Sequence, residues 1–397
     1  MGQEDNKKKA LSGIAVKKLL GKTLENLSSN PHLKITYQMN YDTGYEGYVK
    51  NQFKMDALIK FHNSDDEIWL IKTTSSIRSD RVKGNHFDAQ NIRKINPKVK
   101  RIYLVTSDFA DPKETYNRKK YSEDITNKRL FSPIDDVISF NTLSLLIRDK
   151  AVENLSQGVR ANVLGKETEE RIMRSLNNED NIELWNGILK SDLSFKSVDY
   201  ELFKEILTVY GINNEDEVIM SLYATTDIPL LTGRGQPKTD VHCEVTTNKD
   251  IYNINISVKQ TSAKKVTVHE GFMKDVINVL DLDINSPLGT ALLRLEECGG
   301  KTKLKSKYLE SYTLLENELY KYNDELIKYF IFGIGSKQKD IQIANMLVYN
   351  KTFKAMTINE TINDMKQYSG QFNTPFSFTY PSGNLGKKIQ IKSPTNN

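Results

Sequence analysis

The chain has 397 residues, of which 38% are hydrophobic and 27% charged, and its formal net charge is +5. This length predicts two or three domains, and the composition excludes a disordered chain. The two cysteines exclude a disulfide framework and a zinc finger, and they favour a reducing compartment. We find no signal peptide and no membrane span, so we expect a cytoplasmic protein without a membrane partner.

The first half of the chain predicts a helix, strands, a second helix and a further strand, in that order. The hairpin is indicated by two apolar runs that flank the turn-rich segment 62–66. The predicted elements are a helix at 10–28, a strand with Tyr45 and Tyr48, a hairpin of 55–59 and 68–72, a helix at 85–95, a buried strand at 101–106 and a short helix near 143–147. The sequence Ser156-Gln157-Gly158 interrupts this pattern, so we predict an N-terminal α/β domain of residues 1–155.

The second half repeats the same order of elements, which predicts a second mixed α/β domain at 156–397. A Gly/Pro-rich turn at 232–237 precedes its first strand. The predicted elements are helices at 166–176 and 199–210, strands at 239–246 and 251–259, a helix at 268–280, a charged helical stretch at 307–324, and strands at 328–334, 342–349 and 386–392. No short-period repeat is present, so the two halves share an architectural plan rather than a sequence.

Three polar residues of the predicted 239–246 and 251–259 hairpin have the chemistry of a phosphodiester-cleaving site. Asp240 opens the first strand, and Ser257 and Lys259 lie on one face at the end of the second. The carboxylate of Asp240 can hold Mg²⁺, and Lys259 can orient or deprotonate water or offset charge on a phosphate. Ser257 is a weaker ligand. An aspartate and a lysine at strand ends are also common as ordinary solvated residues, so this pair alone does not decide the function.

Two separated segments resemble the MspI family of type II restriction endonucleases, over roughly residues 160–397. The first contains Pro237-Lys238-Thr239-Asp240 and the run from Ile256 to Val268, and the second contains Phe378-Thr379-Tyr380-Pro381-Ser382-Gly383 and Lys387 to Lys392. The resemblance implies a PD-(D/E)XK nuclease fold, Mg²⁺ dependence and cleavage of a short palindromic site in double-stranded DNA, which in the family is CCGG. It places the catalytic aspartate on Asp240 and the catalytic lysine on Lys259. The family has asparagine where this chain has Ser257.

The same resemblance implies which residues contact DNA. Thr267 falls on a DNA-contacting serine of the family, and Gln390 and Lys392 fall on residues that approach the DNA. Glutamine and lysine can read adenine and guanine edges in the major groove. Lys264 and Lys265 are expected to grip phosphate, which adds affinity but no sequence information. A restriction enzyme also implies a cognate DNA methyltransferase as a genetic partner, because host DNA needs protection.

The first half contains a possible second site formed by Asp56 and Lys72, which also lie on neighbouring predicted strands. Leu70 stands two residues before Lys72, where a nuclease site usually has an acid, and Glu25 on the preceding helix is a possible further ligand. Residues 72–101 contain nine Lys/Arg and only two acids, which suits phosphate contacts. Three interpretations stay open: a DNA-recognition module with an inactive nuclease core, a second active nuclease domain, or an unrelated scaffold.

The sequence therefore predicts a type II site-specific endonuclease. Two alternatives stay open, a catalytically silent DNA-binding protein on a nuclease scaffold and a nonspecific or nicking repair nuclease. Ser257 and Leu70 are the features that favour the silent alternative.

Overall fold

The computed structural model describes residues 2–31, 33–46, 52–62, 67–106, 112–188, 199–231, 236–259, 265–336, 339–349 and 354–394. The chain divides into two compact units, one of Met1–Glu167 with Gly187–Tyr200 and the other of Thr168–Asn186 with Glu201–Asn397. The division falls inside helix α5 (Gln157–Leu176), slightly after the boundary predicted at 155/156. Within the described residues, no helix has both the length and the apolar character that crossing a membrane requires.

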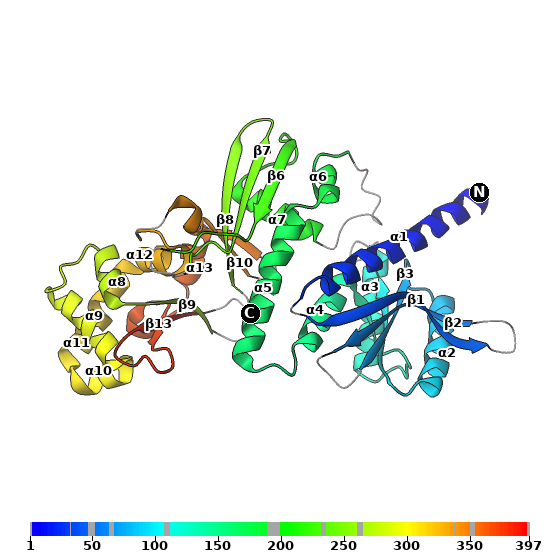
Figure 1. The fold of residues 1–397 in the computed structure, drawn as a ribbon, viewed down its shortest axis with the longest axis horizontal. Coiled ribbons are helices and arrows are strands. Elements are labelled where there is room, and N and C mark those ends of the chain that lie inside the picture. The colour runs from blue at the N-terminus through cyan, green and yellow to red at the C-terminus, as the bar shows by residue number, and fades with distance from the viewer. Residues whose placement is uncertain are drawn as a thin grey trace. The chain divides into compact units, whose positions relative to one another are not determined.

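The first unit is built on a five-stranded sheet with the order β1-β2-β3-β4-β5. Its strands β1, β2 and β3 are labelled in Figure 1. Strands β1, β2 and β3 pair antiparallel, and β3, β4 and β5 pair parallel. Its elements are α1 (Gly2–Ser28), β1 (Ile35–Glu46), β2 (Gln52–Phe61), β3 (Ile68–Thr74), α2 (Ser79–Ile95), β4 (Val99–Thr106), α3 (Pro112–Thr126), β5 (Asp136–Ser139) and α4 (Phe140–Ala151). The predicted order of helix, strands, helix and strand is therefore present, although Tyr48 and the turn at 63–66 lie outside the described residues.

Helices cover both faces of this sheet, which explains why Ile68-Trp69-Leu70-Ile71 is a continuous apolar run. Ile59 and Ile71 pack on one face against Leu20 of α1. Leu70 packs on the other face against Ile92 of α2. The sheet thus fixes the ends of β2 and β3 between α1 and α2.

The second unit contains a five-stranded sheet of order β11-β10-β8-β7-β6 and a three-stranded sheet of order β12-β13-β9. Its strands are β6 (Ile219–Thr225), β7 (Val241–Thr247), β8 (Ile251–Lys259), β9 (Lys265–Gly271), β10 (Met346–Tyr349), β11 (Lys354–Thr357), β12 (Ser377–Thr379) and β13 (Ile389–Pro394). Its helices are α6 (Glu179–Trp185), α7 (Tyr200–Tyr210), α8 (Met273–Val279), α9 (Pro287–Cys298), α10 (Lys301–Lys307), α11 (Leu309–Glu318), α12 (Asn323–Ile327) and α13 (Ile358–Met365), with a π-helical turn at Lys328–Phe332.

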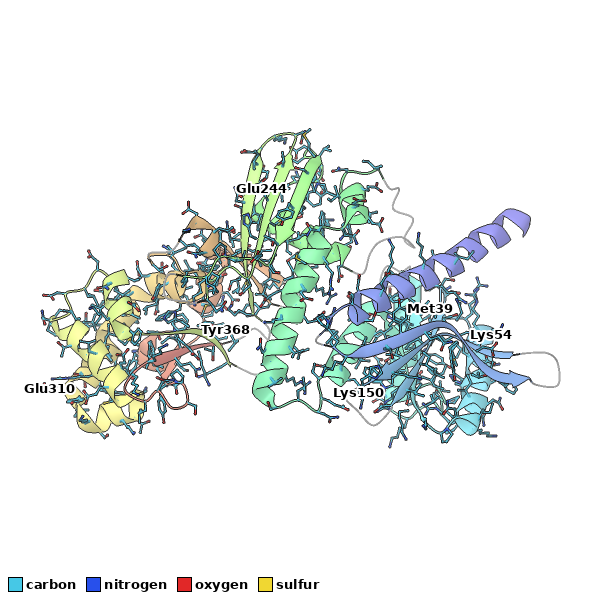
Figure 2. The ribbon with its side chains drawn as sticks, in the orientation of Figure 1. Met39, Lys54, Lys150, Glu244, Glu310 and Tyr368 are labelled. Carbon is cyan, nitrogen blue, oxygen red and sulfur yellow. The ribbon has the colours of Figure 1, made fainter. Side chains whose placement is uncertain are left out.

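Both large sheets share one plan, an antiparallel meander of three strands followed by a parallel neighbour. In the second unit β6, β7 and β8 form the meander, and β10 lies parallel to β8. The repeated order that the sequence indicates is therefore a repeated sheet topology. In Figure 2 Glu244 marks β7, the strand that Asp240 immediately precedes.

Two predicted elements of the second unit are wrong. The helix predicted at 268–280 is strand β9 followed by the shorter helix α8, because β9 needs β13 as its partner and that partner is more than a hundred residues away in sequence. The strand predicted at 328–334 is a π-helical turn in which Tyr329 to Phe332 are all buried. A short run that is apolar on every side has no period, so it cannot distinguish a buried strand from a buried helical turn.

Candidate active site

The side chains of Asp240, Ser257 and Lys259 meet at one end of the β7–β8 hairpin. Lys259 Nζ donates a hydrogen bond to Ser257 Oγ at 2.9 Å and lies 3.5 Å from Asp240 Oδ2. The side chain of Asp240 is 24% exposed and that of Lys259 is 15% exposed, whereas Ser257 is buried. The convergence predicted from the sequence is present, and it leaves the carboxylate partly open to solvent.

Backbone amides fix the position of the Asp240 carboxylate. The amide of Asp240 donates to the Ile256 carbonyl at 2.8 Å, and the amide of Val258 donates to Asp240 Oδ2 at 2.6 Å. The carboxylate therefore faces the segment of β8 that carries Ser257 and Lys259.

Gln342, which the sequence does not single out, secures the segment in front of Asp240. Its buried side chain donates from Nε2 to the carbonyls of Pro229 and Leu230 at 2.9 and 3.0 Å. Its own carbonyl accepts the amides of Lys238 and Thr239 at 3.0 and 3.3 Å. We assign Gln342 a positioning role, because two hydrogen bonds from its buried side chain and two to its backbone carbonyl tie this segment to the residues before Asp240.

Lys238 is a second residue that the sequence does not indicate. It is half-buried, and its Nζ donates to the carbonyl of Val268 on β9. Burial, together with the nearby charge of Lys259, lowers the pKa of Lys238 to about 7, and the charge of Asp240 opposes this shift. Lys238 therefore links the segment before Asp240 to the three-stranded sheet.

The donor set at Asp240 fits a cation that keeps most of its water. Within the described residues, no hydrogen bond reaches Asp240 Oδ1, and no group of three or more His, Cys, Asp or Glu is placed to hold a metal. Val258 offers a backbone carbonyl in the same region: its amide donates to Asp240 Oδ2, and its carbonyl accepts a hydrogen bond from Lys259 Nζ at 3.1 Å. Mg²⁺ commonly binds through one or two carboxylates and several waters, whereas zinc prefers four protein ligands.

The predicted DNA-contacting residues lie on β9 and β13. Thr267 pairs with Lys392 across these strands, and Glu270 pairs with Gln390, whose Nε2 donates to it. Lys265 is exposed and donates to Ser377 Oγ on β12. Because Ile389, Ile391 and Ser393 of β13 are buried, the alternating residues Gln390 and Lys392 face the opposite side of the sheet. Lys264 lies outside the described residues.

Asp56 and Lys72, the possible second site, lie close together in the first unit but contact other groups. Asp56 Oδ1 pairs with Lys17 Nζ of α1 at 2.7 Å, and Oδ2 accepts the amide and hydroxyl of Thr73 at 2.6 and 2.8 Å. Lys72 Nζ donates to the backbone carbonyl of Lys54 at 2.8 Å. Lys54 lies on β2 and is labelled in Figure 2. Glu25 is exposed on α1, and Lys17 is the residue of that helix that reaches Asp56.

His269 is on β9 rather than at a helix start, and its ring packs among aromatic side chains. Its centroid lies 5.0 Å from that of Tyr329 and 5.3 Å from that of Phe330, and Nε2 has no hydrogen-bond partner in the described part of the chain. Burial, aided by the charge of Lys238, lowers the pKa of His269 to about 3.

This histidine predicts a loss of stability in mild acid. Below the ordinary histidine pKa of about 6.5, His269 is protonated in the unfolded chain but stays neutral in the folded unit. The free energy of unfolding therefore decreases as pH drops from 6.5 toward 3. At pH 5.5 the loss should be about 1 kcal/mol relative to neutral pH. His269→Phe should remove this dependence, measured as the urea midpoint from Trp185 fluorescence in a Trp69→Phe background, since the chain has two tryptophans. Equal pH dependence with and without His269 would contradict the assignment.

Comparisons with known proteins show the family to which the chain belongs. The family described as restriction endonuclease MspI matches residues 143–393. The type II restriction enzyme BsuFI of Bacillus subtilis is 40% identical over 397 residues, covering 99% of this chain and 100% of that protein. The crystal structure of restriction endonuclease MspI in complex with its cognate DNA has a TM-score of 0.51 and 19% identity, covering 64% of this chain and 98% of that chain. The chain therefore belongs to the MspI restriction endonuclease family and is a type II enzyme that cleaves DNA at a specific site.

Proposed function

We propose that the enzyme cuts both strands of a short DNA sequence with Mg²⁺ held at Asp240, and that Lys259 is its catalytic lysine. Enzymes of this family generally use a divalent metal. The observation that supports the proposal is the meeting of Asp240, Ser257 and Lys259 within hydrogen-bond or ion-pair distance on one hairpin. Asp240 Oδ1 and the carbonyl of Val258 are the groups that would hold the cation.

The bound cation supplies charge neutralisation at the phosphate and acidifies water. Lys259 contributes an ammonium group beside the same carboxylate, where it can donate to a phosphate oxygen as negative charge develops there. The hydroxyl of Ser257 accepts from Lys259 Nζ and so limits the positions that the ammonium can adopt. Ser257 is therefore a positioning residue in this proposal rather than the acid that stands at this point in many nucleases.

We propose that the outward face of β9 and β13 reads the DNA sequence. Gln390 and Lys392 have the amide and ammonium groups that pair with base edges in the major groove, and Thr267 lies opposite Lys392. Lys265, at the start of β9, has the charge for a phosphate contact. Residues 1–142, which precede the MspI match, form a DNA-binding module in this proposal. A cognate methyltransferase would protect the host DNA in the cytoplasm.

A plasmid digest tests this function. Purified enzyme with Mg²⁺ should give discrete fragments whose sequenced ends share one short motif, and EDTA should prevent cleavage. A smear would instead indicate a nonspecific nuclease, and an intact plasmid that is retarded in a gel would indicate a silent binder. Either of these results would overturn the proposal.

A further inference from the structure

The first unit contains a pocket of about 410 Å³, lined in part by charged and hydroxyl side chains, at the end of β3, the strand that corresponds to β8 in the second sheet. Its walls come from α1, the end of β3 and α2. The charged groups that line it are Lys17, Lys72, Arg81 and Asp88, so cations outnumber the acid by three to one. Burial raises the pKa of Asp88, while the charge of Lys72 opposes that shift.

Hydrogen bonds show how the β2–β3 hairpin beside this pocket differs from the β7–β8 hairpin of the candidate active site. In the second unit Asp240 Oδ2 accepts the amide of Val258 at 2.6 Å, and the lysine is the next residue. In the first unit Asp56 Oδ2 accepts the amide of Thr73, also at 2.6 Å, and the lysine is the preceding residue. When these two amides are aligned, Lys72 takes the place of Ser257 and Thr74 takes the place of Lys259.

The two-residue offset of the lysine removes the features that a metal-dependent nuclease needs. A hydroxyl stands at the position of the catalytic lysine, and a cation stands where many nucleases have an acid. Both oxygens of Asp56 already have partners, Lys17 on one side and Thr73 on the other, and the side chain is 3% exposed against 24% for Asp240. A cation at Asp56 would have to displace an ammonium group that lies 2.7 Å away.

The same changes make the pocket suitable for an anion. Arg81 Nη1 donates to the hydroxyls of Ser75 and Ser76 at 3.3 and 3.1 Å and approaches that of Thr74 at 3.5 Å. These contacts orient the guanidinium and use only one of its nitrogens, although it has five N–H donors. Oriented guanidinium, ammonium and hydroxyl groups are the donors that bind phosphate in proteins.

Two glycines in the pocket wall also support binding of a ligand. Gly13 of α1 and Gly84 of α2 line the pocket from helix interiors, where glycine costs about 1 kcal/mol relative to alanine. A Cβ at either position would meet nothing within 4 Å, so packing within the protein does not require glycine there. Their absence of side chains leaves room for a ligand to approach the helices.

We propose that this pocket binds a phosphate of the DNA backbone without hydrolysing it. The first unit then resembles the second in sheet topology but holds DNA and does not cut it. The proposal rests on the DNA-cleaving function only in that both units act on the same duplex. Its ligand chemistry is a phosphodiester, and free phosphate is the competing source of the same chemistry.

Binding of a short fluorescein-labelled duplex to the full chain in EDTA, over a series of KCl concentrations, tests the proposal. Lys72→Gln and Arg81→Gln should each raise Kd about 5- to 10-fold near 0.1 M salt and reduce the slope of log Kd against log salt by about one. Lys83→Gln is the matched control, because Lys83 is exposed on the same helix and does not line the pocket. Variants that bind with the slope of Lys83→Gln would overturn the proposal.

Two further arms complete the test. Gly84→Gln should weaken DNA binding without lowering thermal stability, whereas Gly165→Gln, in α5 and also with open space around its Cβ, should leave binding unchanged. If inorganic phosphate saturates the pocket while the pocket variants bind DNA normally, free phosphate is the ligand and the proposal fails. If Lys259→Met still nicks one strand and Lys72→Gln abolishes that nicking, the first unit is catalytic and the proposal also fails. Cleavage of DNA by the unaltered enzyme with Mg²⁺ is measured separately, because it tests the proposed endonuclease function and not the phosphate-binding pocket.

Discussion

Replacement of Lys259 by methionine should lower the single-turnover rate of DNA cleavage by roughly 10³-fold or more while DNA binding is retained. The ammonium of Lys259 lies 3.5 Å from Asp240 Oδ2 and is held by Ser257 Oγ, so it can contact a phosphate bound at that carboxylate. Methionine keeps the length and apolar stem of lysine but has no donor. The measurement is quenched-flow or gel-based cleavage of a cognate duplex at saturating enzyme, with anisotropy in EDTA for binding.

Lys249→Met is the control for this variant, because Lys249 lies in the turn of the same hairpin, exposed, in a surface pair with Asp216. It should cleave at close to the normal rate. Asp240→Asn should lose activity to a similar degree, since an amide keeps the shape of the side chain and removes its charge. Normal cleavage by either site variant would show that the reaction takes place elsewhere in the molecule.

Replacement of Arg148 by methionine should destabilise the first unit by about 3–5 kcal/mol, the usual result of leaving one member of a buried ion pair without its partner. Arg148 Nε lies 2.7 Å from Glu167 Oε1, and the two side chains are 7% and 1% exposed. The pair joins α4 to α5, beside the cluster that contains Ile147 and Leu164. Urea unfolding followed by Trp69 fluorescence in a Trp185→Phe background measures the loss, because Trp69 belongs to that cluster.

The double variant Arg148→Met/Glu167→Gln should recover most of this stability, because the remaining buried charge is then removed. Arg160→Met is the matched control: Arg160 pairs with Asp149 at 3.2 Å, but both side chains are at least 40% exposed. We expect that control to change stability by at most about 1 kcal/mol. A double variant as unstable as the single one would show that packing, and not the unpaired charge, causes the loss.

Local patterns predict the hairpins well, because a strand pair with a tight turn is encoded within about twenty residues of sequence. The sequence therefore predicts the β7–β8 hairpin and the convergence of Asp240, Ser257 and Lys259. The fold and the site-specific endonuclease function follow from the resemblance to the MspI family, and the comparisons confirm both. Contacts made over long sequence distances are not accessible in this way. Gln342 reaches the segment before Asp240 from about a hundred residues further along the chain.

The first unit shows a second limit of reasoning from spacing. Asp56 and Lys72 resemble Asp240 and Lys259 in lying on neighbouring strands, but the hydrogen bond from Thr73 places the lysine two residues too early. Because side chains two residues apart lie on the same face of a strand, Lys72 and Thr74 face the same side, and Thr74 occupies the position that Lys259 has in the second unit. Lys17, which neutralises Asp56, comes from a helix about forty residues earlier and has no local signal.

The parallel pairing of β8 with β10 has a consequence for a newly synthesised chain. Tyr349 of β10 lies opposite Lys259, and residues 260–345 separate the two strands, since a parallel pair cannot be closed by a hairpin. Domains generally fold in the order in which the ribosome releases them. The strand that pairs with β8 at Lys259 therefore emerges only after residues 260–345 have been made, and a chain that stops before β10 should be unable to cut the chromosome of its own cell.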